Sequence, residues 1–236
     1  MQIKIIAAGS TKLERFFRKW GVSFLINDDI LFDAFGKPSV LNRQLKELSI
    51  DVSKIKHIII SHDDWDHISG LWDILERNKN VTVYICPNFA QEIKQKINSY
   101  GVKTVEVRDF QKISEGVYST GEMLGNSEGR IIYEQSLILK DPNELAIITG
   151  CAHPGIVSII EEVRSKFKDS ICLLIGGMHL KGKGKDEIKE TVLKFKEHNI
   201  AKVAPMHCTG RYALRLMEKE LKDNFIRIKQ GDIVNI

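Results

Sequence analysis

A cluster of ionisable side chains directly after an apolar run is the feature that most constrains this chain. The run Ile58–Ile60 predicts a buried strand, and the segment SHDDWDH follows it at residues 61–67. In that segment, five of the six residues from His62 to His67 can ligate a metal. A metal ion compensates the desolvation of several buried polar groups at once. The segment therefore predicts a metal site at a strand end, and a solvated acidic turn is the simpler alternative.

Histidines also follow the ends of other predicted strands. They are His62 and His67 after 57–60, His153 after 145–149, His179 after 171–175 and His207 after 202–205. In layered α/β folds the carboxyl ends of strands form the edge where sites assemble. A single histidine so placed is more often a structural residue. Five at equivalent edges favour one shared site.

Short β-branched runs alternate with amphipathic helical stretches along the chain. Strands are predicted at 3–7, 23–27, 30–32, 57–60, 81–86, 104–107, 117–119, 136–140, 145–149, 171–175, 202–205, 225–228 and 233–235. Helices are predicted at 40–48, 68–77, 88–98, 155–167, 186–198 and 212–221. No fixed repeat or linker rich in Pro, Gly or Ser divides the chain, so one domain over residues 1–236 is expected.

The composition excludes several classes of protein. Hydrophobic residues make up 43% and charged residues 28%, as in ordinary globular domains. The net charge of +4 is mild and the lysines are spread out, which argues against a nucleic-acid partner. No apolar run reaches membrane-spanning length, and the N-terminus lacks a signal-peptide pattern. We expect a cytoplasmic protein with free cysteines and a small-molecule substrate, and a homodimer is left open.

The motifs resemble those of a known family. The matching stretches are residues 31–33, 61–71, 119–122, 149–157, 176–180 and 204–210. In them the chain resembles the metallo-β-lactamase superfamily, whose signature is H-x-H-x-D-H followed by separate downstream histidines. Within it, the likeness is to the branch of dihydropterin-ribofuranosylaminobenzene-phosphate synthase-like proteins. The resemblance implies an α/β fold, the four-layer αββα sandwich, in which two mixed β-sheets pack face to face with helices outside.

The resemblance also implies a dinuclear metal site, with zinc as the expected ion. By this likeness His62, Asp64 and His153 would hold one ion, and Asp66, His67 and His207 would hold the other. A water or hydroxide between the ions would be the nucleophile, because the metals lower its pKa. Asp66 would orient that water while it ligates.

Asp64 departs from the superfamily pattern, which has histidine at this position. A carboxylate makes the site harder and more anionic, which favours iron or manganese relative to zinc. Two plainer alternatives stay open. Asp64 can ligate zinc through an ordinary carboxylate oxygen, or the first site has decayed and one ion remains.

A second departure lies at the edge that reads Gly176-Gly177-Met178-His179, where many superfamily hydrolases carry a bridging aspartate. His179 could ligate, donate a proton to a leaving group or grip an anionic substrate. Glu122 is expected to line the substrate pocket from a loop over 121–133. Cys151 and Cys208 are read as small packing residues, and thiolate ligation is the lesser alternative.

The favoured interpretation is a metal-dependent hydrolase for a small anionic molecule such as a phosphodiester, ester or lactone. Two other classes stay open. One is a diiron redox or oxygen-binding protein resembling the flavodiiron proteins, in which a carboxylate replaces the same histidine. The other is a metal-binding sensor without turnover.

Overall fold

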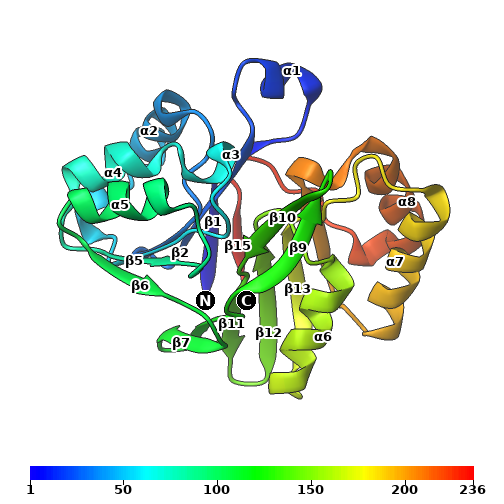
Figure 1. Ribbon diagram of the computed structural model, residues 1–236. Coiled ribbons are helices and arrows are strands. Elements are labelled where there is room, and N and C mark those ends of the chain that lie inside the picture. Colours follow the sequence, from blue (N-terminus) through cyan, green and yellow to red (C-terminus); the bar gives the residue numbers. More distant parts are fainter.

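Two mixed β-sheets stack face to face, and helices cover both outer surfaces (Figure 1), in the computed structural model of residues 1–236. The first sheet has the order β15 (Ile233–Asn235), β1 (Gln2–Gly9), β2 (Gly21–Ile26), β3 (Ile30–Phe32), β4 (His57–Ile59), β5 (Thr82–Ile85) and β6 (Lys103–Glu106). The second has the order β14 (Val203–Met206), β13 (Ser170–Gly177), β12 (Glu144–Thr149), β11 (Leu137–Asp141), β8 (Val117–Ser119) and β7 (Gln111–Ser114). Neighbours β3 to β6 and β12 to β14 run parallel, and the other pairs are antiparallel.

Three hydrophobic clusters separate the four layers. Helices α2 (Pro38–Glu47), α4 (Leu71–Arg77) and α5 (Gln91–Ser99) cover the first sheet, and α6 (Ile156–Lys166), α7 (Lys185–Glu197) and α8 (Arg211–Leu221) cover the second. The third cluster lies between the sheets. Strand β2 shows the alternation, since Phe24 packs between the sheets and Leu25 packs under the helices. The predicted αββα architecture is confirmed.

The carboxyl ends of the parallel strands meet at one edge of the molecule. The short helix α3 (Trp65–Ile68) follows β4 at this edge, and α1 (Lys12–Phe16) projects beyond it (Figure 1). Helix α1 was not predicted, but Thr11 and Glu14 form a capping box that starts it. None of the helices is both long and apolar enough to cross a bilayer.

Three sequence predictions differ from the structure. The strand predicted at 225–228 is absent, because its ladder is limited to a single bridge between Phe225 and Val203. Its apolar residues Ile226 and Ile228 pack on the rim of the core between the sheets. The loop predicted at 121–133 is instead a hairpin of β9 (Met123–Ser127) and β10 (Arg130–Glu134), which pair antiparallel over their full length. In addition, the helix predicted at 68–77 is interrupted at 69–70, so that α3 and α4 are separate.

Candidate metal centre

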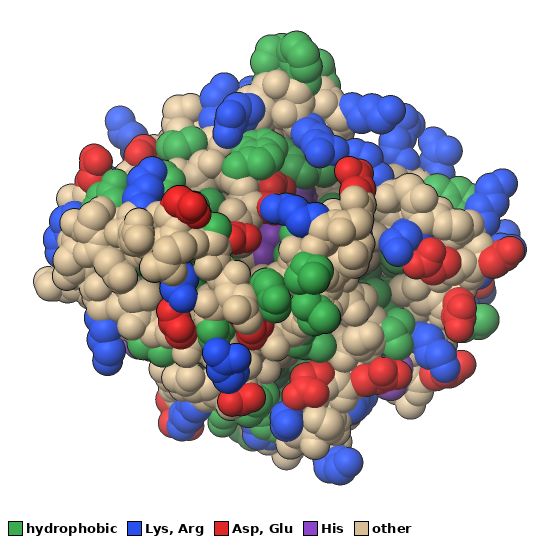
Figure 2. Space-filling view, in the orientation of Figure 1, with side chains coloured by type: hydrophobic (Ala, Val, Ile, Leu, Met, Phe, Trp, Pro, Cys, Tyr) green, Lys and Arg blue, Asp and Glu red, His purple; other side chains and the backbone are tan.

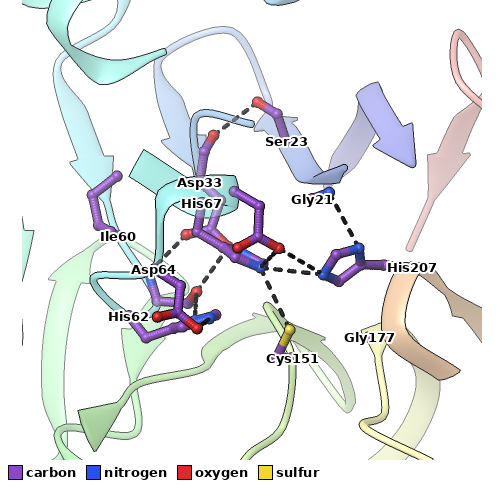
Figure 3. Close-up of polar contacts among 12 residues, drawn as sticks. Gly21, Ser23, Asp33, Ile60, His62, Asp64, His67, Cys151, Gly177 and His207 are labelled. Carbon is purple, nitrogen blue, oxygen red and sulfur yellow. Dashed lines mark hydrogen bonds and ion pairs between the residues drawn. The ribbon is translucent and has the colours of Figure 1, made fainter. Parts of the chain in front are cut away.

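The edge loops bring five histidine rings into one row. Ring centroids are 4.3 Å apart for His179 and His153, 4.7 Å for His153 and His62, 4.1 Å for His62 and His67, and 5.1 Å for His67 and His207. Four different loops, after β4, β12, β13 and β14, supply these rings. Histidines separated by up to 145 positions therefore share one site (Figure 3).

Three ligand atoms form a nearly equilateral triangle at one end of the row. Asp66 Oδ2 lies 3.4 Å from His67 Nε2 and 3.3 Å from His207 Nε2, and the two nitrogens are 3.3 Å apart. Tetrahedral coordination with metal bonds of about 2.0–2.1 Å places ligand atoms about 3.3–3.4 Å apart. These three residues therefore have the spacing of one face of a tetrahedral metal site.

His62 and His153 lie beside this triangle and, together with Asp64, form a second set of possible metal ligands. His62 is fully buried, and its Nε2 has no hydrogen-bond partner, which in a native site points to a ligand. Asp64 Oδ2 lies 3.7 Å from His62 Nε2, and the Asp64 side chain is 22% exposed. The other oxygen of Asp64 accepts a hydrogen bond from Arg130. This set also fits a metal ion, with Asp64 on the solvent side.

Asp33 orients His67, a role that its place in the sequence did not predict. Its Oδ2 accepts hydrogen bonds from His67 Nδ1 at 2.6 Å and from Ser61 Oγ at 2.8 Å, and its Oδ1 accepts one from Ser61 N at 2.7 Å. This bond directs His67 Nε2 towards the triangle, as metal-binding histidines require. The sequence did mark the stretch 31–33 as similar to the family. It gave no sign that Asp33 pairs with a histidine 34 residues further along the chain.

Glu134 holds His153 in the same way. The carboxylate is buried and accepts hydrogen bonds from the backbone N–H groups of Cys151, Ala152 and His153 and from His153 Nδ1, each at 2.8 Å. No sequence signal marked this residue, which stands at the end of β10, directly after the loop predicted at 121–133. The hairpin brings it under the 151–153 turn.

His207 is oriented by the backbone of β1 and β2. Its Nδ1 lies 3.0 Å from Gly9 O, to which it can donate, and its Nε2 then faces the triangle. Gly21 N also approaches this ring, at 3.2 Å. A side chain at Gly21 is excluded, because a Cβ there would overlap the Asp66 carbonyl and φ is +109°.

The charges of the site are strongly coupled. Burial lowers the pKa of His67, but the Asp33 and Asp66 carboxylates outweigh it and hold this pKa well above the ordinary value. Burial raises the pKa of Asp66, but His67 and His207 outweigh it and hold that pKa well below the ordinary range. Burial, with His67 nearby, lowers the pKa of His62. Without metal, the site thus favours a proton on His67 between two carboxylates.

Metal affinity should consequently rise with pH. A raised pKa stabilises the metal-free protein with His67 protonated, and this proton must leave before Nε2 can ligate. Below the pKa of His67 we expect the affinity for Zn²⁺ to increase about tenfold per pH unit for each proton released. Chelator competition at several pH values measures this slope. Asp33→Asn should make it shallower, and an affinity independent of pH would contradict the assignment.

The two residues expected to contact substrate are placed differently. His179 is half-buried against His153, and its Nδ1 is buried without a partner. Glu122 lies outside the histidine row, because its carboxylate accepts hydrogen bonds from Asn88 N at 2.8 Å and Asn88 Nδ2 at 2.7 Å. The structure therefore brings together every predicted site residue except Glu122.

Known proteins resemble this chain over most of its length. Residues 21–105 match the family model described as the metallo-β-lactamase superfamily. A 7,8-dihydropterin-6-methyl-4-(β-D-ribofuranosyl)-aminobenzene-5'-phosphate synthase of Methanocaldococcus jannaschii is 28% identical over 93% of this chain and 90% of that protein. An uncharacterised protein of the same archaeon is also 28% identical, over 99% of this chain and 100% of that protein. A crystal structure described as a metal-dependent hydrolase of the β-lactamase superfamily superposes with a TM-score of 0.82, at 23% identity, over 100% of this chain and 99% of that one.

Proposed function

We propose that this chain is a metal-dependent hydrolase of small anionic substrates, and that it belongs to the metallo-β-lactamase superfamily, whose fold it shares and whose family model it matches over residues 21–105. The observation that carries the proposal is the triangle of Asp66 Oδ2, His67 Nε2 and His207 Nε2 beside the unpartnered Nε2 of His62. Divalent ions in such a site supply an activated water and polarise the bond under attack. Zinc is the ion we propose, with iron or manganese as alternatives because of Asp64.

Asp66 and His179 are the residues that would act on the reacting groups. Asp66 contacts both histidines through Oδ2, so its Oδ1 is available to orient a nucleophile. Its pKa is held well below the ordinary range, so it stays ionised at neutral pH. His179 lies next to His153 but outside the triangle, a position suited to donating a proton to the leaving group.

The mouth of the site is rich in cations and aromatic faces. Figure 2 shows histidine atoms at the bottom of a hollow, with lysine and arginine side chains at its rim. Arg130 pairs with Asp64, and Arg18 lies 4.8 Å above the ring of Trp65. Lys181 lies 4.9 Å from the ring centroid of Trp20. Such a rim attracts anions, which supports an anionic substrate.

A synthase activity is the second candidate, because the relative from Methanocaldococcus jannaschii bears that name. Its name includes a 5'-phosphate, which suits a cationic rim, and an aminobenzene group. Anionic aromatic phosphate esters are therefore the first compounds to assay, both for hydrolysis by water and for transfer to an added acceptor.

The proposal is tested by element analysis of protein purified without added metal, followed by assays with aryl phosphodiesters, phosphomonoesters and lactones. We expect bound transition metal and a hydrolytic activity that a chelator removes and one of zinc, manganese or iron restores. Protein without metal above background, and without metal-dependent turnover on any of these esters, would overturn it.

Replacing Asp64 by histidine should shift the metal preference towards zinc, because imidazole replaces a hard carboxylate oxygen. We expect little change in the free energy of unfolding, since the side chain is partly exposed at the mouth. Competition between zinc and manganese measures the preference. Arg130→Gln is the matched control, because it removes the partner of Asp64 and keeps the carboxylate. The same ranking of metals in Asp64→His and wild type would show that Asp64 is no ligand.

Replacing His179 by alanine should lower turnover by roughly 10²–10⁴-fold, as expected for a lost general acid. Metal content should stay nearly intact, because the triangle and His62 do not involve this ring. His57→Ala is the control, since His57 stands at the other end of β4 and contacts Tyr84. Loss of one metal equivalent in His179→Ala would identify His179 as a ligand and end the proton-donor role.

A further inference from the structure

The end of β13 cannot supply a bridging carboxylate. A Cβ at Gly177 would overlap the Gly150 carbonyl, lie 2.7 Å from Cys208 Sγ and lie 3.2 Å from Cys151 Cα. Any side chain at this position would therefore collide with the 150–151 turn and with a thiol. The space beside Gly177 is already occupied by the 150–151 turn after β12 and by the Cys208 thiol.

Cys151 places its sulfur between the two ligand sets. Its Sγ, His62 and His153 have ligand atoms within 4.8 Å of one another, and the same holds for Sγ, His67 and His207. The sulfur lies 3.5 Å from His67 Nε2. A tetrahedral ion with bonds of about 2.3 Å to sulfur and about 2.0–2.1 Å to nitrogen would place these atoms about 3.5–3.6 Å apart. The spacing is that of two ligands on one ion.

Cys208 is close by but differently engaged. Its Sγ donates to Cys151 O and accepts from His179 N, each at 3.4 Å. The ligand atoms of Cys208, Cys151 and His179 lie within 4.8 Å of one another, and Cys208 forms no such group with the other histidines. Its hydrogen bonds are with the backbone of two site loops, and its sulfur does not join the ligand atoms of His62, His67 or His207. Of the two buried thiols at this edge, only Cys151 reaches both ligand sets.

We propose that Cys151 is a metal ligand whose thiolate bridges the two ion positions, in place of the carboxylate that β13 cannot provide. The inference rests on the proposed metal site. On binding, the thiol gives its proton to solvent and the sulfur donates one lone pair to each ion. The buried, unpartnered Nε2 of His62 independently indicates an ion on the far side of this sulfur. A soft thiolate offsets the hard Asp64 and favours zinc over manganese.

Cobalt(II) added to the metal-free protein tests this without any substrate. Bound cobalt gives visible d–d absorption, and a thiolate ligand adds a near-ultraviolet sulfur-to-cobalt band. We expect this band in the wild type, growing over both equivalents of cobalt because the sulfur bridges. Cys151→Ser should abolish the band and weaken binding by at least the roughly 10–100-fold that a lost outer partner costs. Cys208→Ser and the remote Cys172→Ser should keep the band.

The outcomes separate the two proposals. Visible absorption without the sulfur band would overturn the role of Cys151 and leave the metal site standing. A band that saturates at the first equivalent while a second ion binds would overturn the bridge, as would a band lost in Cys208→Ser and not in Cys151→Ser. Absence of any cobalt binding would overturn both proposals. The wild-type titration decides between one ion and two even where Cys151→Ser does not fold.

Discussion

Asp66→Ala should release one metal equivalent per chain and lower hydrolysis by more than about 10⁴-fold, beyond the usual range for a single proton-transfer group. The carboxylate is a corner of the ligand triangle and the candidate to orient the nucleophile, so both functions disappear together. Its loss also leaves His67 and His207 facing each other without the negative charge between them. Element analysis and a turnover assay on the best substrate found are the measurements.

Asp63→Ala is the matched control for this variant. Asp63 belongs to the same segment, but its Oδ2 accepts a hydrogen bond from Ala90 N at 2.8 Å on an exposed turn. Metal content and turnover should therefore stay near those of the wild type. Full metal occupancy in Asp66→Ala would show that the triangle is no ligand set, and the hydrolase proposal would lose its main support.

Glu134→Ala should destabilise the metal-free protein by about 3–5 kcal/mol, the usual cost of removing one partner of a buried ionic pair. Three backbone N–H groups and His153 Nδ1, all in a buried part of the protein, lose their acceptor at once. The His153 ring also loses its orientation, so one metal position should weaken. Denaturant unfolding and metal titration measure the two effects.

The pH dependence of this effect follows from the charge of Glu134. Burial raises its pKa, but His62 and His153 outweigh burial and hold the pKa well below the ordinary 4.5. A depressed pKa contributes stability above pH 4.5 that is lost as the pH falls through the folded value. The stability difference between wild type and Glu134→Ala should therefore shrink in acid.

The control for Glu134→Ala lies in the same hairpin. Glu128 stands in the β9–β10 turn, outside the buried core, so Glu128→Gln should change the free energy of unfolding by less than about 0.5 kcal/mol. Equal and small effects of Glu128→Gln and Glu134→Ala would contradict the structural role of Glu134.

Local pattern was sufficient to predict most elements and most of the side chains that gather at the edge. Alternating apolar residues mark the strands, because successive side chains of a strand point to opposite faces. Histidine and aspartate directly after those strands mark the edge, because parallel strands end together. The row from His62 to His207 was predictable on this basis, once the strands were predicted to run side by side.

The predictions that failed concern which strands pair with each other. The periodicity of apolar residues along the chain was not the source of the errors. The segment 225–228 has the composition of a strand, but the neighbouring edge offers it only one bridge, with Val203. The segment 121–133 lacks a strong strand pattern and still forms a hairpin, since β9 and β10 satisfy each other's backbone groups. Glu122, expected to line the substrate pocket from this loop, lies just before β9, and its carboxylate accepts hydrogen bonds from Asn88.

Residue type and local spacing determine that this chain has buried strands, and that these strands end in groups able to ligate a metal. They do not determine which group orients which ligand. His67 depends on Asp33 at a separation of 34 residues, and Cys151 lies beside His67 at a separation of 84. The first contact exists because β3 and β4 pair in parallel within the first sheet. The second exists because the two sheets pack with one relative placement, which is set by the whole apolar core between them and by no segment alone.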